Sequence, residues 1–171
     1  MLEDESYLDE NGEIVKKGIT LMNPEIVSII LCNYSKLKEE GWDNFKKDIW
    51  YLMQDFDALC AKALAENPFY DRLIQLKVDG IQNAQIQEIL YDEFGIKHSL
   101  EYISSLWRKK IPKLISHYAE NEFLKTQNLP QKVCTRCGQS KPAHNNFFSK
   151  NRGSKDSFYS ICKECRNKKR G

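Results

Sequence analysis

Cys134-Thr-Arg-Cys137-Gly138 contains two cysteines separated by two residues, and the chain repeats this spacing at Cys162-Lys-Glu-Cys165. Each Cys-x-x-Cys stretch places two sulfur atoms on one tight turn, and Gly138 permits the positive φ that is needed after the second sulfur. Two such turns supply four thiolates, which are the complete tetrahedral ligand set of a structural zinc site. The spacing therefore predicts that Cys134, Cys137, Cys162 and Cys165 bind one structural Zn²⁺ ion.

The residues between the two cysteine pairs are typical of a β-hairpin. Two short apolar runs, Phe147-Phe-Ser-Lys150 and Phe158-Tyr-Ser-Ile161, flank a polar stretch over residues 151–157. Such a hairpin would bring the second pair back to the first, so we expect a zinc ribbon over residues 132–169. A module of about 40 residues cannot bury enough surface to fold alone, whereas structural zinc contributes about 10–16 kcal/mol at pH 7. Cysteine pairs in a reducing compartment also favour a metal over a disulfide.

The motif around these cysteines resembles small zinc ribbons that are common in bacteriophage proteins. The residues that carry the resemblance are Val133-Cys-Thr-Arg-Cys-Gly-Gln-Ser-Lys-Pro142, Phe147-Phe148 and Ser160-Ile-Cys-Lys-Glu-Cys-Arg166. Such ribbons often lie beside nucleases of the HNH and endonuclease VII kind, so the resemblance implies zinc and an association with nucleic acid. It covers about a quarter of the chain. Many similar ribbons carry a glycine after the loop aspartate, where this chain has Ser157 after Asp156.

A nuclease site does not follow from this resemblance. An HNH site needs a histidine general base, an asparagine and further metal ligands, but the chain contains only three histidines, His98, His117 and His144. No second histidine follows His144 in the ribbon, so we interpret His144 as a loop or surface residue and the other two as structural. We therefore expect no catalytic residue in this chain.

Charge divides the chain into an acidic front and a basic tail. Residues 1–66 carry 7 Lys/Arg against 14 Asp/Glu, whereas residues 131–171 carry 11 against 2, within a formal net charge of +2. A basic tail of this kind favours contact with a polyanion. Inside the acidic front, the segment 1–22 contains Asn11-Gly12, which predicts the turn of a small hairpin over residues 7–16.

The sequence also argues against membrane insertion and secretion. No apolar run approaches the roughly 18 residues of a membrane span. The start, Met1-Leu-Glu-Asp-Glu5, is acidic, whereas a signal peptide begins with basic residues. We therefore expect a cytoplasmic protein of a bacterial or phage-infected cell, with no membrane partner and no small-molecule substrate.

Residues 23–66 predict an antiparallel pair of helices. Asn23-Pro24 is a cap followed by proline in the first helical position, and apolar residues then recur at helical spacing until Gly41. After a tight turn at Gly41-Trp42, a second helix is expected from about Asp43 to about Glu66.

Two cysteines of this pair, Cys32 and Cys60, fall on or near its apolar stripes, and we interpret both as core thiols. The acidic surface of residues 24–66 would mediate either a homodimer or contact with a protein partner. No residue in this part distinguishes the two.

Residues 67–126 resemble the tri-helical helix-turn-helix fold of DNA-binding proteins. Cap and stop signals predict helices over residues 68–79, 83–94, 99–111 and 112–124. Pro112 disfavours helical backbone at Ile111, so the Ser99-capped helix is expected to end there. This helix would enter the major groove, since its length of about 18 Å fits that groove.

Two sets of side chains are expected to contact nucleic acid. The set on the helices comprises Ser99, Glu101, Ser104, Ser105, Arg108, Lys109, Lys110 and Lys113. The set in the ribbon comprises Arg136, Arg152, Lys155, Lys163, Arg166, Lys168, Lys169 and Arg170. Serine and arginine can contact base edges, whereas lysines bind phosphates. The alternative for the helical set is an ordinary bundle whose basic helix end complements the helix dipole.

The expected protein is thus mainly α, a helical bundle with a tri-helical helix-turn-helix and a small C-terminal β zinc ribbon. Its predicted function is that of a non-enzymatic, zinc-containing protein of a phage or mobile element that binds double-stranded DNA and regulates transcription. Three alternatives stay open. One is the DNA-recognition subunit of a larger assembly, such as a small-terminase-like packaging subunit or a nuclease accessory. The second is an RNA-binding zinc-ribbon protein, and the third is a nuclease whose site the sequence does not reveal.

Overall fold

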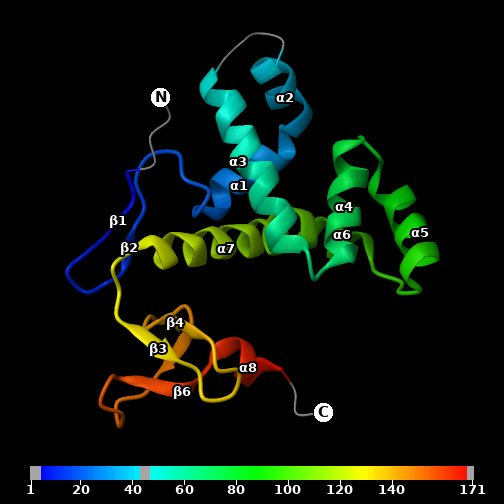
Figure 1. The fold of residues 1–171 in the computed structure, drawn as a ribbon. Helices are drawn as coiled ribbons and strands as arrows, with labels where there is room; N and C mark the ends of the chain where they lie inside the picture. Colours follow the sequence, from blue (N-terminus) through cyan, green and yellow to red (C-terminus); the bar gives the residue numbers. More distant parts are fainter. Residues whose placement is uncertain (1–4, 43–46, 169–171) are drawn as a thin grey trace. The chain divides into compact units, whose positions relative to one another are not determined.

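The fold is mainly helical, with short antiparallel two-stranded sheets (Figure 1). This computed structural model describes residues 5–42 and 47–168. Contacts divide the chain into two compact units: unit 1 comprises residues 1–9 and 13–119, and unit 2 comprises residues 10–12 and 120–171. Among the described helices, none combines the length and the apolar character needed to span a bilayer.

The predicted N-terminal hairpin is confirmed. Strand β1 (Tyr7–Leu8) pairs with β2 (Ile14–Val15) in antiparallel fashion, with Tyr7 opposite Val15. Gly12 in the connecting turn has a φ of 75°, a left-handed conformation that costs glycine little. The acidic start at residues 1–4 lies outside the described residues.

Helix α1 (Pro24–Cys32) begins as predicted, because the Asn23 side chain accepts the N–H of Glu25 at 2.9 Å. It ends earlier than expected, since the Asn33 side chain donates to the Ile29 carbonyl at 2.8 Å and α2 (Tyr34–Trp42) begins just beyond. A carbonyl at the end of α1 thus gains a local partner, and the apolar stripe alone gave no sign of the break.

Helix α2 continues through Gly41 to Trp42, so the prediction that Gly41 ends the helix is wrong. A glycine inside a helix costs only about 1 kcal/mol relative to alanine, which neighbouring packing can offset. The long helix α3 spans Lys47–Leu64, and the expected start near Asp43 lies outside the described residues. Helices α2 and α3 are joined by Asp57, which accepts the Tyr34 hydroxyl at 2.7 Å and pairs with Lys38 at 3.0 Å.

Helices α4 (Pro68–Val78) and α6 (Leu100–Ser105) begin at the predicted capping residues. In α4 the Asn67 side chain accepts the N–H of Tyr70, and in α6 the Ser99 hydroxyl accepts that of Tyr102. Between them, α5 (Asn83–Phe94) ends at Gly95, whose φ is 70°.

These helices share one apolar core with α1 and α3. Its fully or nearly fully buried side chains include Val27, Leu31, Met53, Phe56, Leu73, Leu76, Ile86, Leu90, Ile103, Leu106, Ile111 and Ile115. Burial of one such side chain contributes about 1.5–3 kcal/mol, so this shared core holds the helices of unit 1 together.

The predicted helix end before Pro112 is wrong. The chain passes from α6 through a π-helical turn, η1 (Leu106–Lys110), directly into α7 (Ile111–Thr126). The N–H of Ile111 donates to the carbonyl of Leu106, five residues earlier. In a regular α-helix the proline ring would clash with a carbonyl of the preceding turn. The wider π turn relieves that clash, so the helix accommodates the proline.

The C-terminal part contains the predicted hairpin and one that was not predicted. Strand β5 (Phe148–Lys150) pairs with β6 (Phe158–Cys162), which leads into the short helix α8 (Lys163–Asn167). In addition, β3 (Gln131–Val133) pairs with β4 (Ser140–Pro142), so the first cysteine turn closes a hairpin of its own.

Candidate metal centre and cationic surfaces

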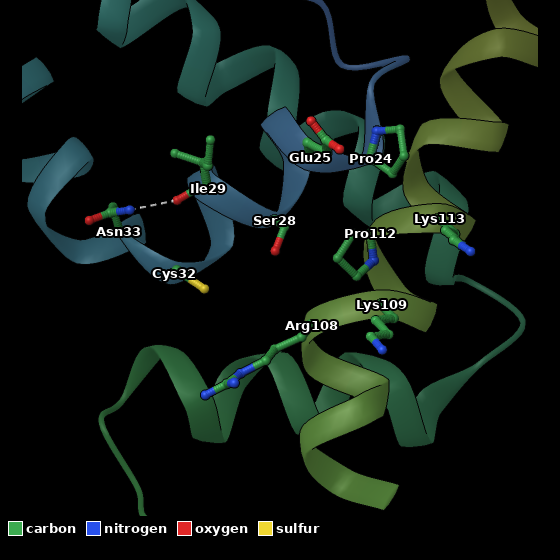
Figure 2. Close-up of a pocket in the computed structure, with 10 residues that line it drawn as sticks. All are labelled: Pro24, Glu25, Ser28, Ile29, Cys32, Asn33, Arg108, Lys109, Pro112 and Lys113. Atoms are coloured by element: carbon green, nitrogen blue, oxygen red, sulfur yellow. Dashed lines mark hydrogen bonds between the residues drawn. The ribbon is translucent and has the colours of Figure 1, made fainter.

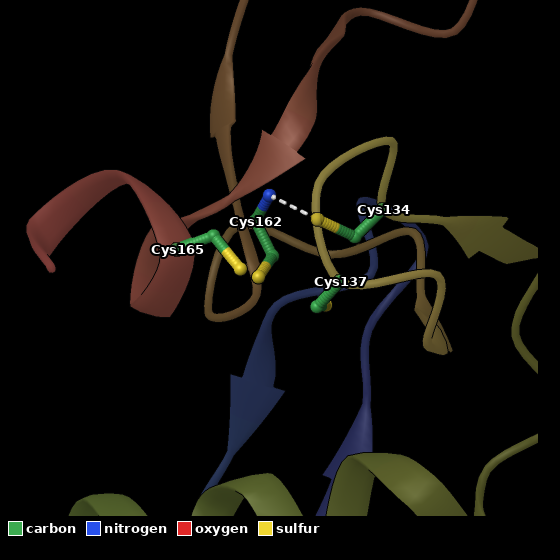
Figure 3. Close-up of side chains that lie close together, drawn as sticks. All are labelled: Cys134, Cys137, Cys162 and Cys165. Carbon is green, nitrogen blue, oxygen red and sulfur yellow. Dashed lines mark hydrogen bonds between the residues drawn. The ribbon is translucent and has the colours of Figure 1, made fainter. Parts of the chain in front are cut away.

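The structure brings the four predicted ligands together. The Sγ atoms of Cys134, Cys137, Cys162 and Cys165 all lie within 4.8 Å of one another (Figure 3). The first two come from the turn between β3 and β4, the third from the end of β6 and the fourth from α8. A tetrahedral zinc–thiolate site with bonds of about 2.3 Å has sulfurs about 3.8 Å apart. The four cysteines fit a single structural Zn²⁺ ion.

Backbone N–H groups prepare one of these sulfurs for metal binding. The N–H of Cys162 donates to Sγ of Cys134 at 3.3 Å, a bond drawn in Figure 3. Burial raises the pKa of the Cys134 thiol, but the N–H groups of Cys162, Cys137 and Arg136 outweigh it and lower that pKa to about 6. Gly138 follows with the predicted positive φ, 71°. The turn geometry therefore favours the thiolate that a metal requires.

The other two buried sulfurs show the opposite shift. Burial raises the pKa of Cys162 and that of Cys165, the latter to about 12, where hydrogen bonds from the Cys165 thiol to the neighbouring sulfurs reinforce the rise. Four thiolates so close together repel one another, and a divalent cation removes this cost. All the cysteines are free thiols. Bound zinc would tie the first cysteine turn to the second and supply folding energy to unit 2.

Both carboxylates of the ribbon are already paired. Glu164 accepts Lys141 Nζ at 2.6 Å, and Asp156 forms an ion pair with Lys132. Burial lowers the pKa of Lys141, but Glu164 and the nearby cysteines more than compensate and hold it above its usual range. The remaining positive charge of the ribbon has no carboxylate of the ribbon to neutralise it.

The predicted ribbon contacts lie mostly on the surface. Arg136, Arg152, Lys155, Arg166 and Lys168 are exposed, Lys163 is half-buried, and Lys169 and Arg170 lie outside the described residues. The side chains that sequence reasoning assigned to nucleic acid in this part are therefore accessible wherever they are described.

The predicted nucleic-acid contacts on the helices differ in how exposed their side chains are. Glu101, Arg108, Lys109, Lys110, Lys113 and Ser99 are exposed, whereas Ser104 and Ser105 are half-buried. The Ser99 hydroxyl caps α6, and the pKa of Glu101 is lowered by its own backbone N–H and by that hydroxyl. These two side chains therefore serve the start of the helix, and the basic residues of η1 and α7 form the accessible remainder.

Three of these basic residues line a pocket of about 440 Å³ with α1 (Figure 2). Arg108, Lys109 and Lys113 contribute to it from η1 and α7, together with Pro112; the lining residues of α1 are Pro24, Glu25, Ser28, Ile29 and Cys32, followed by Asn33. Within the described residues, no salt bridge involves Arg108, Lys109 or Lys113. We call this pocket the cationic groove. Sequence reasoning missed it, because nothing local indicates that α1 packs beside η1.

A fourth cation lies beside the groove. Burial, followed by the charge of Arg108, lowers the pKa of Lys77 on α4. The Lys77 ammonium also lies 6.0 Å from the centre of the Trp107 ring. The positive charges of Lys77 and Arg108 therefore repel each other beside the groove, and a bound anion would relieve that repulsion.

His144 lies in a loop, as expected, but it is buried there and is not a surface residue. Its side chain is 8% exposed, its Nδ1 accepts the N–H of Asn146 at 3.1 Å, and its Nε2 lies 3.0 Å from the Gly12 carbonyl. This arrangement requires a neutral ring with the proton on Nε2. The Gly12 acceptor lies too far along the sequence for a local pattern to reveal it.

One further histidine and the two cysteines outside the cluster differ in their surroundings. His98 stacks on Tyr102 with ring centres 4.5 Å apart, consistent with a structural role. Cys32 is exposed, so its interpretation as a core thiol is wrong; it lies at the end of α1, where the apolar face no longer meets the core. Cys60 is largely buried, and burial, followed by the charges of Asp57 and Asp71, raises its pKa to about 12.

Comparisons of the chain with models of protein families, with curated proteins and with solved structures gave no match. Among the chain's own features, the cluster of four cysteines suited to one zinc ion gives the clearest indication of its chemistry.

Proposed function

We propose that this chain is a non-enzymatic, zinc-containing protein that binds double-stranded DNA and regulates transcription. The observation that carries the proposal is the cationic groove, where Arg108, Lys109 and Lys113 form no salt bridge with any described residue and Lys77 adds a repelling charge. Concentrated, unneutralised positive charge is what a phosphate backbone requires of its partner. The origin in a phage or mobile element is supported by the resemblance of the ribbon motif.

Helices α4, α5 and α6 would form the helix-turn-helix. They follow one another through the short connections 79–82 and 95–99, and their buried faces share one core. Helix α6 and η1 would then face the major groove, with Arg108 near base edges and Lys109 and Lys113 on phosphates. The π turn that carries Arg108 supports this role, since such turns often mark functional sites.

The shape of the cationic groove limits which part of a duplex could bind in it. Because α1 also lines the cationic groove, a single phosphate strand would fit there beside Lys109 and Lys113. The ribbon would add phosphate contacts elsewhere on the duplex, and zinc would act only by holding the ribbon folded.

Fluorescence anisotropy of a labelled duplex, with zinc-loaded protein at low and moderate salt, tests this function. We expect binding that weakens steeply with salt. Replacing Arg108 and Lys109 by alanine should weaken it at least several-fold. The matched control, Lys36→Ala with Lys62→Ala, removes equal charge from exposed positions of α2 and α3 and should change it less than twofold. Absence of binding at low salt, or equal losses in both double variants, would overturn the proposal.

A second candidate is the DNA-recognition subunit of a larger assembly. It is favoured by large apolar side chains that face solvent on α1 and α3, Ile29 at 57% and Tyr51 at 60% exposure. Exposed apolar side chains on an otherwise acidic part can contribute to contact with another protein or a second copy. Light scattering of the purified chain distinguishes the candidates, because a ring-forming subunit has a mass many times 20.0 kDa and a dimeric regulator twice that value.

A further inference from the structure

A second cationic pocket lies within the ribbon itself. Its volume is about 440 Å³, in the range of pockets that take small ligands. The lining residues are Arg136, Tyr159, Ser160, Ile161, Arg166, Asn167 and Lys168. Three of them are cationic and none is acidic, although this part of the chain has carboxylates at Asp156 and Glu164. Those carboxylates are held elsewhere by Lys132 and Lys141.

An aromatic platform forms one part of this pocket. The Tyr159 side chain is 44% exposed, and the guanidinium carbon of Arg166 lies 4.9 Å from the centre of its ring. Holding an exposed tyrosine ring in place for stacking costs little conformational entropy, since the side chain has few rotatable bonds. Ile161 adds apolar surface two residues further along β6, on the same face of the strand.

One cation of the pocket, Arg136, is anchored by the backbone at the metal centre. Arg136 donates from Nη1 to the carbonyl of Cys165, which leaves further guanidinium N–H groups to meet a ligand. Arg136 lies between the first two cysteines, and Arg166 directly follows the last of them. The ion that joins Cys137 to Cys165 would therefore also fix the distance between the two arginines.

We propose that this pocket binds one unpaired nucleotide of a single-stranded nucleic acid. The base stacks on Tyr159 beside Arg166, and the adjoining phosphate binds Arg136 and Lys168. Ser160 and Asn167 offer hydrogen bonds to the base or the sugar. A base inside a duplex cannot stack in this way, since both of its faces are already covered by its neighbours. The inference deepens the proposed function, on which its nucleic-acid partner rests, by giving the ribbon a separate role on unpaired strands.

The test measures anisotropy of labelled oligothymidylate with the zinc-loaded full chain, in parallel with a labelled duplex. Replacing Tyr159 by leucine should weaken single-strand binding about fivefold or more, the loss expected for one stacked base. Tyr159→Phe keeps the platform and should restore most of the affinity. Tyr91→Leu, at a 49% exposed tyrosine of α5, is the matched control and should have no effect.

The same anisotropy measurement tests the role of the Arg166 charge and that of the nucleotide sugar. Arg166→Ala should weaken single-strand binding more than Arg152→Ala, which removes equal charge from the hairpin loop outside the pocket. Oligouridylate replaces oligothymidylate to distinguish the source of the strand: tighter binding of the RNA assigns Ser160 or Asn167 to the 2′-hydroxyl, and equal binding assigns recognition to base and phosphate.

The outcomes separate this inference from the function on which it rests. Selective loss in Tyr159→Leu, with zinc content unchanged, supports the pocket even if the duplex does not bind. Equal affinity of Tyr159→Leu and Tyr91→Leu for the single strand overturns the pocket, even if the duplex binds through the cationic groove. A loss in Tyr159→Phe as large as in Tyr159→Leu also overturns it, because the phenyl ring retains the stacking surface.

Discussion

The backbone N–H of Cys162 donates to Sγ of Cys134 over 3.3 Å, so the two cysteine turns are joined by a hydrogen bond in addition to any metal. This bond stabilises the negative charge on the sulfur and contributes to lowering the Cys134 pKa to about 6. The backbone N–H groups therefore favour the thiolate at Cys134, whereas Cys162 and Cys165, whose pKa values are raised, must lose protons when a metal binds.

Replacing Cys137 by serine should release zinc and unfold the ribbon. Cys137 is the exposed member of the cluster, and its loss leaves three ligands and an open position. Zinc content, measured by mass spectrometry, should fall to a small fraction of the wild-type value, while the far-ultraviolet signal of the helices is mostly retained. Cys32→Ser, at an exposed cysteine outside the cluster, is the control. Unchanged zinc content in Cys137→Ser would contradict the metal assignment.

Alkaline pH should weaken unit 1 through Cys60. In the unfolded chain its thiol ionises near its ordinary pKa of 9.0, but in the folded chain the pKa is about 12. Between these values the folded state holds a proton that the unfolded state has lost, so stability falls as pH rises from about 9 to 12, by at most about 1.4 kcal/mol per pH unit. Urea unfolding at pH 8 and pH 10 measures the change, and Cys60→Ala should reduce it. An identical pH dependence in that variant would disprove the role of Cys60.

His144→Ala should destabilise the ribbon. The substitution leaves the half-buried Gly12 carbonyl and Asn146 N–H without their partner, at a cost of about 1 kcal/mol. Zinc removal by a chelator should become faster, because chelation requires the ribbon to open. His117→Ala, at an exposed position of α7, serves for comparison. Equal chelation rates in the two variants would mean that the His144 contacts contribute nothing.

Ser157→Gly should stabilise the ribbon. Ser157 has a φ of 61°, and a side chain in this left-handed region costs roughly 1–2 kcal/mol, partly offset by the greater freedom of glycine when unfolded. We expect a net gain of about 0.5–1 kcal/mol, measured as a higher thermal midpoint of the zinc-loaded ribbon. Ser154→Gly should have the opposite sign, because it removes a hydroxyl whose single proton lies within hydrogen-bond reach of the Asn151 and Phe158 carbonyls. A lower midpoint for Ser157→Gly would refute the strain argument.

Features that depend on neighbours in sequence could be predicted. Helix caps at Asn23, Asn67 and Ser99 need only the side chain and the next three residues, and all of them are confirmed. The zinc ligands follow the same rule, since each Cys-x-x-Cys turn is local and the hairpin between them has its own pattern. The comparison with similar ribbons, which carry a glycine after the loop aspartate, also pointed to a local backbone feature. Ser157, which follows Asp156 here, has the left-handed conformation for which glycine is suited.

Features that depend on distant packing could not be predicted. The helix passes Pro112 because a π turn and a buried surface offset the missing N–H, and neither is encoded in the proline itself. The cationic groove requires α1 to pack beside η1, a contact between segments far apart in the chain. The burial of His144 likewise depends on Gly12.

That last contact has a consequence for biosynthesis. Gly12 and His144 are 132 positions apart, and the fourth sulfur, at Cys165, emerges from the ribosome later still. All the residues of the unit 1 core, through Ile115, are translated before the ribbon can close. Because chains fold from the N-terminus as they are made, metal loading is expected to be the last step of maturation. A zinc-starved cell should then accumulate chains with a finished helical unit and an open, protease-sensitive ribbon.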